Sequence, residues 1–265
     1  MSIKISLKKN INDKLIKNYV LFANEKYKIN GLSKISLSKN AAEINENIGS
    51  NSDNKKKFLL FNIRPNQKII IIKTDNNQSS LKNEEIGAEL YNFIKSNLIY
   101  DITFLESNIL ETNSKNKFFF DEFTHGFQLK SYSFEKYKTK KNNKDIYLNI
   151  SLSKNSLNLK KDKRFESLIE GTNFTKDLVS EPGNILHPDE YAKRISSLKK
   201  FGLKVTVYDE NKLKKLGMNA LLGVGQGSIR GSYLVTIEWN GSQSKKKPLA
   251  FVGKGVCFDT GGISL

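Results

Sequence analysis

The sequence predicts an α/β protein built from two domains, and three observations support this prediction. Short strand-like apolar runs alternate along the chain with segments whose apolar residues recur at helical spacing. The chain has 265 residues, of which 38% are hydrophobic, enough to form a sizeable core in one large or two ordinary domains. The composition changes near residue 160, because the first part is rich in lysine, asparagine and serine. We therefore expect a small N-terminal α/β domain over residues 1–160 and a second α/β domain, with a mixed, largely parallel sheet, over residues 161–265.

In the first part, four runs have the length and composition of β-strands. These runs are residues 58–61, 68–73, 100–105 and 146–150. One helix is expected among them, with Ser80 as its capping residue. The apolar residues that would share one face of this helix are Ile86, Leu90, Phe93 and Ile94. Two polar, lysine-rich stretches are expected to be solvated loops: residues 51–57 and 136–144.

The second part predicts helices and strands in alternation. A first helix has Phe165 and Leu178 on its apolar face and ends near Pro182, because proline cannot continue the hydrogen-bond ladder. A second helix begins at His187 and ends before Gly202. Further elements are expected as a strand at 203–208, a short helix at 210–216, and strands at 232–239 and 248–252.

Several function classes are disfavoured by the composition. No apolar run approaches the roughly 18 residues of a membrane helix, and the N-terminal stretch carries charge but no apolar core of a secretory signal. Cys257 is the single cysteine, so no internal disulfide is possible. These features predict a cytoplasmic protein with no membrane attachment.

The net charge of +17 raises the question of a nucleic-acid partner. Lysine, asparagine and isoleucine are all abundant, as expected when an AT-rich genome biases codon use, and the lysines are scattered rather than held on one stripe. The compositional explanation is therefore favoured, with weak DNA binding left open.

The most informative segment is the last one, residues 251–265. Lys254 follows an apolar run and lies between two glycines. Asp259 comes five residues later and is followed, after one residue, by Gly261 and Gly262. In open α/β sheets, ligand sites lie at the carboxyl ends of strands, and glycine lets the backbone approach an ion or substrate closely. A surface lysine and a turn aspartate would produce the same pattern. Spacing alone therefore leaves both a metal role and a structural role open.

Two phosphate-binding motifs are absent from this part of the chain. A Walker A loop fails because Lys254 is followed by Gly255 and because Pro248 occupies the position of the required first glycine. A dinucleotide-binding loop fails because its third glycine is replaced by Ser228. The glycines of residues 223–227 are better interpreted as a tight turn.

The remaining candidate side chains favour structural roles. Cys257 is expected to pack within a buried strand rather than act as a nucleophile. His125 is expected in a loop and His187 at a helix start, and neither has a partner at the spacing of metal ligands.

Residues 252–264 closely resemble the metal-binding signature of the leucyl (cytosol) aminopeptidase family. Two further segments stand in the family's order. Residues 173–184 resemble its helix leading into the catalytic domain, and residues 216–228 resemble its glycine-rich turn. The resemblance spans residues 165–265, whereas residues 1–160 agree only in domain type, since the family carries a variable, macro-domain-like α/β domain there.

The resemblance implies a two-metal aminopeptidase that releases N-terminal residues such as leucine from peptides. Two divalent ions, Mn²⁺ or Zn²⁺, would activate a water. Lys254 would be a terminal ligand to one ion, Asp259 would bridge both, and Gly261 and Gly262 would let the backbone pass close to the substrate. Holding a lysine neutral at pH 7 costs roughly 4–5 kcal/mol, which metal binding can offset.

The chain departs from the family at its end. In the family, a catalytic lysine, a catalytic arginine and the remaining metal ligands follow this signature, so they are expected beyond Leu265 and no catalytic residue is assigned. We therefore expect an incomplete copy that is inactive alone. The family implies a homo-hexamer acting on peptides. The alternative is a basic, non-enzymatic DNA-binding protein, since some relatives also bind DNA.

Overall fold

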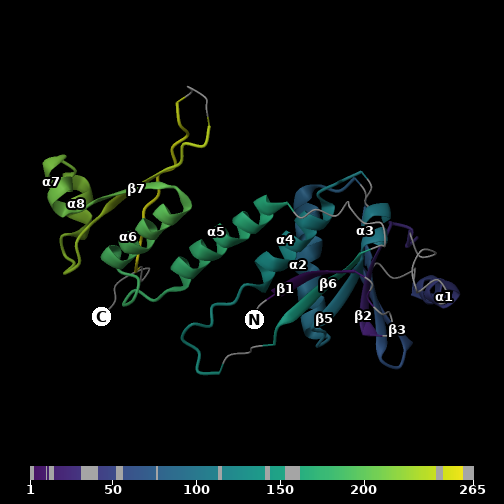
Figure 1. Cartoon of the computed structure of the whole chain (residues 1–265). Coiled ribbons are helices and arrows are strands. Elements are labelled where there is room, and N and C mark those ends of the chain that lie inside the picture. Colours follow the sequence, from purple (N-terminus) through teal and green to yellow (C-terminus); the bar gives the residue numbers. More distant parts are fainter. Residues whose placement is uncertain are drawn as a thin grey trace. The chain divides into compact units, whose positions relative to one another are not determined.

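The computed structural model describes residues 3–9, 11, 15–30, 41–51, 56–75, 77–112, 115–140, 144–152, 162–242 and 247–258 (Figure 1). The chain forms two compact units that divide between Asn173 and Phe174. This division falls within helix α5 (Lys163–Ser180), whereas the boundary expected from composition, after residue 160, precedes that helix. Within these described ranges, no helix is both long and apolar enough to cross a membrane.

The first unit is built on a six-stranded sheet. Its strands are β1 (Ile3–Lys9), β2 (Asn18–Ala23), β3 (Phe58–Arg64), β4 (Gln67–Lys73), β5 (Asp101–Leu105) and β6 (Ile146–Leu152). Their order is β1-β6-β5-β2-β4-β3, and every neighbouring pair is parallel except β3 with β4. The four strands expected from the sequence are confirmed as β3 to β6, while β1 and β2 were not anticipated.

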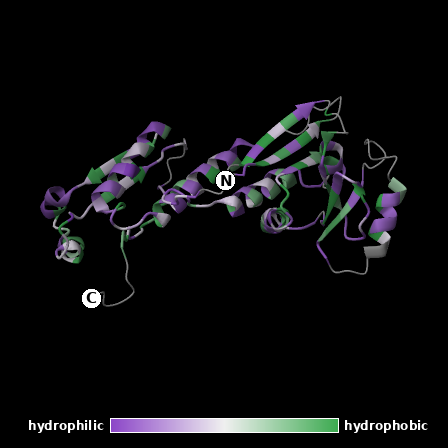
Figure 2. Cartoon of the chain, turned by 90° about the horizontal axis from the view of Figure 1, so that it is seen from below, coloured by the Kyte–Doolittle hydropathy of each residue, from purple (hydrophilic) through white to green (hydrophobic). Residues whose placement is uncertain are grey.

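Both faces of the central strands are buried, which explains their nearly continuous apolar sequences. Successive side chains of a strand point to opposite faces. Val20 and Phe22 belong to one apolar cluster, with side chains of helices α2 (Ser80–Ser96) and α4 (Phe119–Ser131). Tyr19 and Leu21 belong to a second cluster, which also contains Ile44 of helix α1 (Ala41–Asn51). Figure 2 shows where hydrophobic residues, in green, and hydrophilic residues, in purple, lie along the strands.

The expected helix is confirmed as α2, although its N-cap is Ser79 rather than Ser80. The Ser79 hydroxyl accepts a hydrogen bond from the backbone N–H of Lys82, as N-cap side chains do. Helix α1, helix α3 (Glu106–Thr112) and helix α4 were not anticipated. The expectation that His125 lies in a loop is wrong, because it is buried in α4.

Helices α2 and α4 approach each other closely through two glycines. A Cβ added at Gly87 would lie 1.9 Å from the carbonyl oxygen of Phe123, and one at Gly126 would lie 1.9 Å from that of Glu84. Only glycine therefore fits at either position. The close crossing brings Phe123 and Phe127 over the sheet, where both are fully buried.

The second unit has shorter elements. After α5 they are α6 (Pro188–Ser196), the 3₁₀ helix η4 (Ser197–Phe201), β7 (Lys204–Tyr208), α7 (Glu210–Lys215), α8 (Asn219–Gly225) and β8 (Leu234–Glu238). Helix α5 ends at Ser180, two residues before Pro182, as expected. The second expected helix is confirmed as α6 with η4, and Gly202 ends it with a positive φ of 82°.

Three details of the second unit correct the sequence-based expectations. Strands β7 and β8 pair antiparallel, because an alternating pattern sets which side chains share a face but not the direction of the neighbouring strand. The glycines at 223 and 225 lie in helix α8, so the turn begins only at Gln226 and the tight turn expected over 223–227 is wrong. Residues 248–252 form no strand, and Phe251 and Val252 are 90% and 98% exposed.

Candidate metal-binding segment

The structure describes one of the predicted site residues, Lys254. This residue is exposed, in a segment without regular secondary structure over residues 247–258. The backbone N–H of Val256 donates to the carbonyl oxygen of Lys254 at 3.1 Å, which makes a tight turn at Gly255. Asp259, Gly261 and Gly262 lie outside the described residues.

The end of this segment packs within the second unit against the start of α6 and the turn before it. A Cβ at Gly255 would come within 2.9 Å of the Tyr191 ring, and a Cβ at Gly183 would lie 3.1 Å from the Phe258 side chain. Both glycines therefore permit close contact between backbone and aromatic ring. The signature segment is thus positioned by the turn that follows α5 and by the first residues of α6.

The start of α6 is held by charged contacts. The prediction that His187 begins a helix is confirmed, since it is the N-cap and its ring nitrogen accepts from the backbone N–H of Glu190 at 3.4 Å. Its Nδ1 also contacts the carboxylate of Asp189. The other oxygen of that carboxylate pairs with Arg230 Nη1 at 3.2 Å. Arg230 therefore links the chain after α8 to the first turn of α6.

A second ion pair, between Glu181 and Arg194, was missed by sequence reasoning. The Glu181 side chain is 2% exposed, and its Oε1 accepts from Arg194 Nη1 at 2.8 Å. Arg194 Nε also donates to Glu190 Oε1 at 3.0 Å. Hydrogen bonding to Glu181 first, and to Glu190 second, raises the pKa of Arg194. The pair ties the turn after α5 to helix α6.

Cys257 is half-buried beside this framework. Burial first, and the negative charge of Asp189 second, raise the pKa of its thiol. A thiol with a raised pKa is a poor nucleophile, because the thiolate is the reactive form. Its Sγ lies 3.8 Å from the carbonyl oxygen of Gly255, so the side chain packs on its own turn. The residue lies in a bend, so the expectation of a buried strand cysteine is wrong in both its secondary structure and its full burial.

The donor set for a metal is incomplete in the part of the chain that the structure describes. These residues contain no group of three or more His, Cys, Asp or Glu side chains that could hold a metal ion. Lys254 brings one nitrogen donor, and two-metal sites need several carboxylate or imidazole ligands. The described residues alone therefore do not form a two-metal centre.

Sequence comparisons place the second unit among known proteins. Residues 173–265 match the catalytic domain of the cytosol aminopeptidase family. A "Probable cytosol aminopeptidase" of Phytoplasma mali is 51% identical over 150 residues, which are 54% of this chain and 30% of that protein. A protein of the same name from Brucella anthropi is 46% identical over 147 residues, 53% of this chain and 30% of that protein. The chain thus matches these curated relatives over about 30% of their length.

Two solved structures share the fold. A mutant of tomato leucine aminopeptidase aligns with a TM-score of 0.72 and 20% identity, over 98% of this chain and 55% of that one. The bottromycin maturation enzyme BotP aligns with a TM-score of 0.60 and 13% identity, over 85% of this chain and 46% of that one. The resemblance seen in the sequence is confirmed, since residues 173–265 match the catalytic domain of the cytosol aminopeptidase family and the fold is that of a leucine aminopeptidase.

Proposed function

We propose that the protein is a cytoplasmic, metal-dependent aminopeptidase that releases N-terminal residues such as leucine from peptides. The match of residues 173–265 to the family's catalytic domain carries this proposal. The similar proteins from Phytoplasma and Brucella are named as aminopeptidases, which gives the DNA-binding alternative no support. As in the family, the complete protein would be a homo-hexamer acting on peptides.

Lys254 and Asp259 are the residues that we propose as metal ligands, Lys254 to one ion and Asp259 bridging two. Lys254 is exposed and forms no ion pair with the other described residues, so its amine is available to a metal. BotP has been solved in complex with manganese, which supports a divalent metal, Mn²⁺ or Zn²⁺, at this site. When bound, such ions polarise a carbonyl and supply a nucleophilic water. Gly261 and Gly262 would let the backbone pass close to the peptide substrate.

The 265-residue chain alone is expected to show no aminopeptidase activity, because Lys254 and Asp259 are the only two of its residues that match the metal ligands implied by the resemblance. A longer protein that joins this chain to the rest of the family's catalytic domain, the full product, is expected to hydrolyse leucine p-nitroanilide with Mn²⁺ and to lose this activity with a chelator. Both proteins are assayed side by side. Chelator-sensitive hydrolysis by the 265-residue chain contradicts the first expectation. A folded full product that is inactive with Mn²⁺ and with Zn²⁺ contradicts the proposed function.

Within that full product, Asp259→Asn is expected to reduce kcat/KM by at least about a hundredfold, whereas Cys257→Ala should change it less than about threefold. A bridging carboxylate holds both ions, while Cys257 only packs on its own turn. Metal content, measured by elemental analysis of the dialysed protein, should fall in the first variant and not in the second. Equal losses of activity and metal at equal folded content contradict the two assignments.

A further inference from the structure

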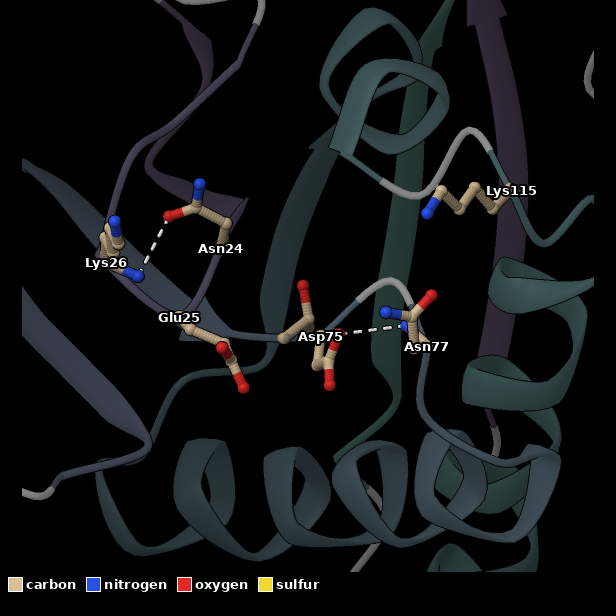
Figure 3. Close-up of a pocket in the computed structure, with 7 residues that line it drawn as sticks. Asn24, Glu25, Lys26, Asp75, Asn77 and Lys115 are labelled. Carbon is tan, nitrogen blue, oxygen red and sulfur yellow. Dashed lines mark hydrogen bonds between the residues drawn. The ribbon is translucent and has the colours of Figure 1, made fainter.

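A polar pocket lies at the carboxyl ends of two parallel strands in the first unit (Figure 3). Its volume is about 380 Å³, and it is lined by Asn24–Lys26 after β2, by Thr74, Asp75 and Asn77 after β4, and by Lys115 between α3 and α4. In Figure 3, Lys115 enters from one side and Glu25 and Lys26 lie on the other. All of these residues belong to the first unit, whereas Lys254 belongs to the second.

The strand order explains why a pocket forms at this place. Strand β2 has β4 on one side and β5 on the other, and the chain crosses from β4 over to β5. The connections on the two sides of β2 therefore diverge. Open α/β sheets bind ligands outside the carboxyl ends of their strands at such a reversal point.

Hydrogen bonds within the loops hold the pocket's polar backbone in place. Asn24 Oδ1 accepts from the backbone N–H groups of Lys26 at 3.0 Å and Lys28 at 2.9 Å. Asp75 Oδ1 accepts from the backbone N–H of Asn77 at 2.9 Å, and the Thr74 hydroxyl donates to the carbonyl oxygen of Ala23 at 3.2 Å. None of these hydrogen bonds involves the side-chain ammonium group of Lys26 or Lys115.

The four charged side chains of the lining remain available. Among the described residues, Glu25, Lys26, Asp75 and Lys115 form no ion pairs, although two are cations and two are anions around one space. The lining holds no aromatic or long aliphatic side chain, so it offers a nucleobase or an acyl chain nothing to pack on. A phosphate would meet two carboxylates here, and a metal ion would meet two ammonium groups.

A ligand that carries both charges matches this arrangement. We propose that the pocket binds a zwitterion, the free ammonium and carboxylate of an amino acid or a short peptide. The carboxylates of Glu25 and Asp75 hold the ammonium, and Lys115 holds the carboxylate. Because the pocket is open to solvent, the affinity is modest and falls with added salt. The proposal does not depend on the peptidase function, since none of these residues belongs to the family's catalytic domain.

The test is a titration of the ¹⁵N-labelled 265-residue chain with L-leucine and with L-leucylglycine, followed by NMR. A chelator is present throughout, so that metal-dependent hydrolysis does not contribute. Saturable shifts are expected, with a Kd on the order of 1 mM. The tighter of the two ligands identifies the source as a free amino acid or a peptide. N-acetyl-L-leucine lacks the ammonium and L-leucinamide lacks the carboxylate, and each should bind about tenfold more weakly.

Two variants assign the charges. Asp75→Asn should bind L-leucine about tenfold more weakly and lose the preference for it over N-acetyl-L-leucine. Lys115→Gln should lose the preference over L-leucinamide instead. Lys130→Gln, which removes an exposed lysine at the end of α4, is the matched control and should leave the Kd unchanged. The proposal is overturned by tighter binding of inorganic phosphate, by tighter binding of Mn²⁺ in a separate titration without chelator, by equal binding of the blocked ligands, or by no saturable shift with either zwitterion.

Discussion

Replacing Gly126 by alanine is expected to lower the free energy of unfolding of the first unit by about 3 kcal/mol. The added Cβ would lie 1.9 Å from the carbonyl oxygen of Glu84 and 2.5 Å from its Cα. These are backbone atoms of α2, so no side-chain rotation relieves the overlap. The helices must separate, and the packing of Phe123 and Phe127 against the sheet is then lost.

Urea denaturation followed by circular dichroism measures this effect. Gly171→Ala is the matched control, because it makes the same substitution inside a helix of the same unit, at an exposed position where a Cβ would meet nothing within 4 Å. That variant is expected to gain about 0.5–1 kcal/mol, since alanine favours helix over glycine. Equal stabilities for the two variants would show that the contact between α2 and α4 is not as close as described.

Replacing the fully buried Asn108 by leucine is expected to cost the first unit about 2–4 kcal/mol. Its side-chain amide bonds backbone groups of β2 that a neighbouring strand would otherwise bond. The pairing of β2 with β5 ends at Val20 and Phe104. Beyond that point, Asn108 Oδ1 accepts from the backbone N–H of Phe22 at 2.7 Å, and its Nδ2 donates to the carbonyl oxygen of Phe22 at 3.0 Å. Leucine has a similar size but removes the Asn108 partner of the Phe22 N–H and leaves the Phe22 carbonyl oxygen with a longer bond of 3.4 Å from the Thr112 hydroxyl.

Two measurements separate this effect from a general loss of packing. Equilibrium unfolding gives the free energy, and hydrogen exchange of the Phe22 amide reports the lost bond directly. Asn92→Leu, at an exposed position of α2, is the control and should change the free energy of unfolding by less than about 0.5 kcal/mol. Unchanged protection of the Phe22 amide in Asn108→Leu would contradict the role assigned to this side chain.

Most of the regular elements could be predicted from local pattern, and the exceptions have physical causes. Strands β3 to β6 and helix α2 have apolar residues at the period of their own element. Helix α4 was missed because its phenylalanines favour strands in isolation, and only packing against the sheet selects the helix. The apolar run at residues 248–252 predicts a strand, yet in the structure it pairs with none of the described strands, and Phe251 and Val252 are exposed.

Sites were less predictable than elements. Lys254 was found because the signature around it is contiguous in sequence. The Glu181–Arg194 pair joins residues 13 positions apart across a turn whose geometry the sequence does not specify. The zwitterion pocket gathers three loops whose proximity follows from the strand order, and strand β2 was itself not anticipated. Local periodicity therefore finds elements, whereas a site built from distant loops requires the topology.

The pairing of β1 with β6 also sets the timing of folding during synthesis. The two strands are joined in parallel, and the Ser6 hydroxyl donates to Asn149 Oδ1 at 2.8 Å across a separation of 143 residues. At about 5–20 residues per second, a ribosome produces β1 roughly 7–30 s before β6. During that interval the first strand made has no partner and its backbone groups stay hydrated. The sheet is completed only when residues 146–152 leave the ribosome, so the speed of translation limits how early this unit can fold.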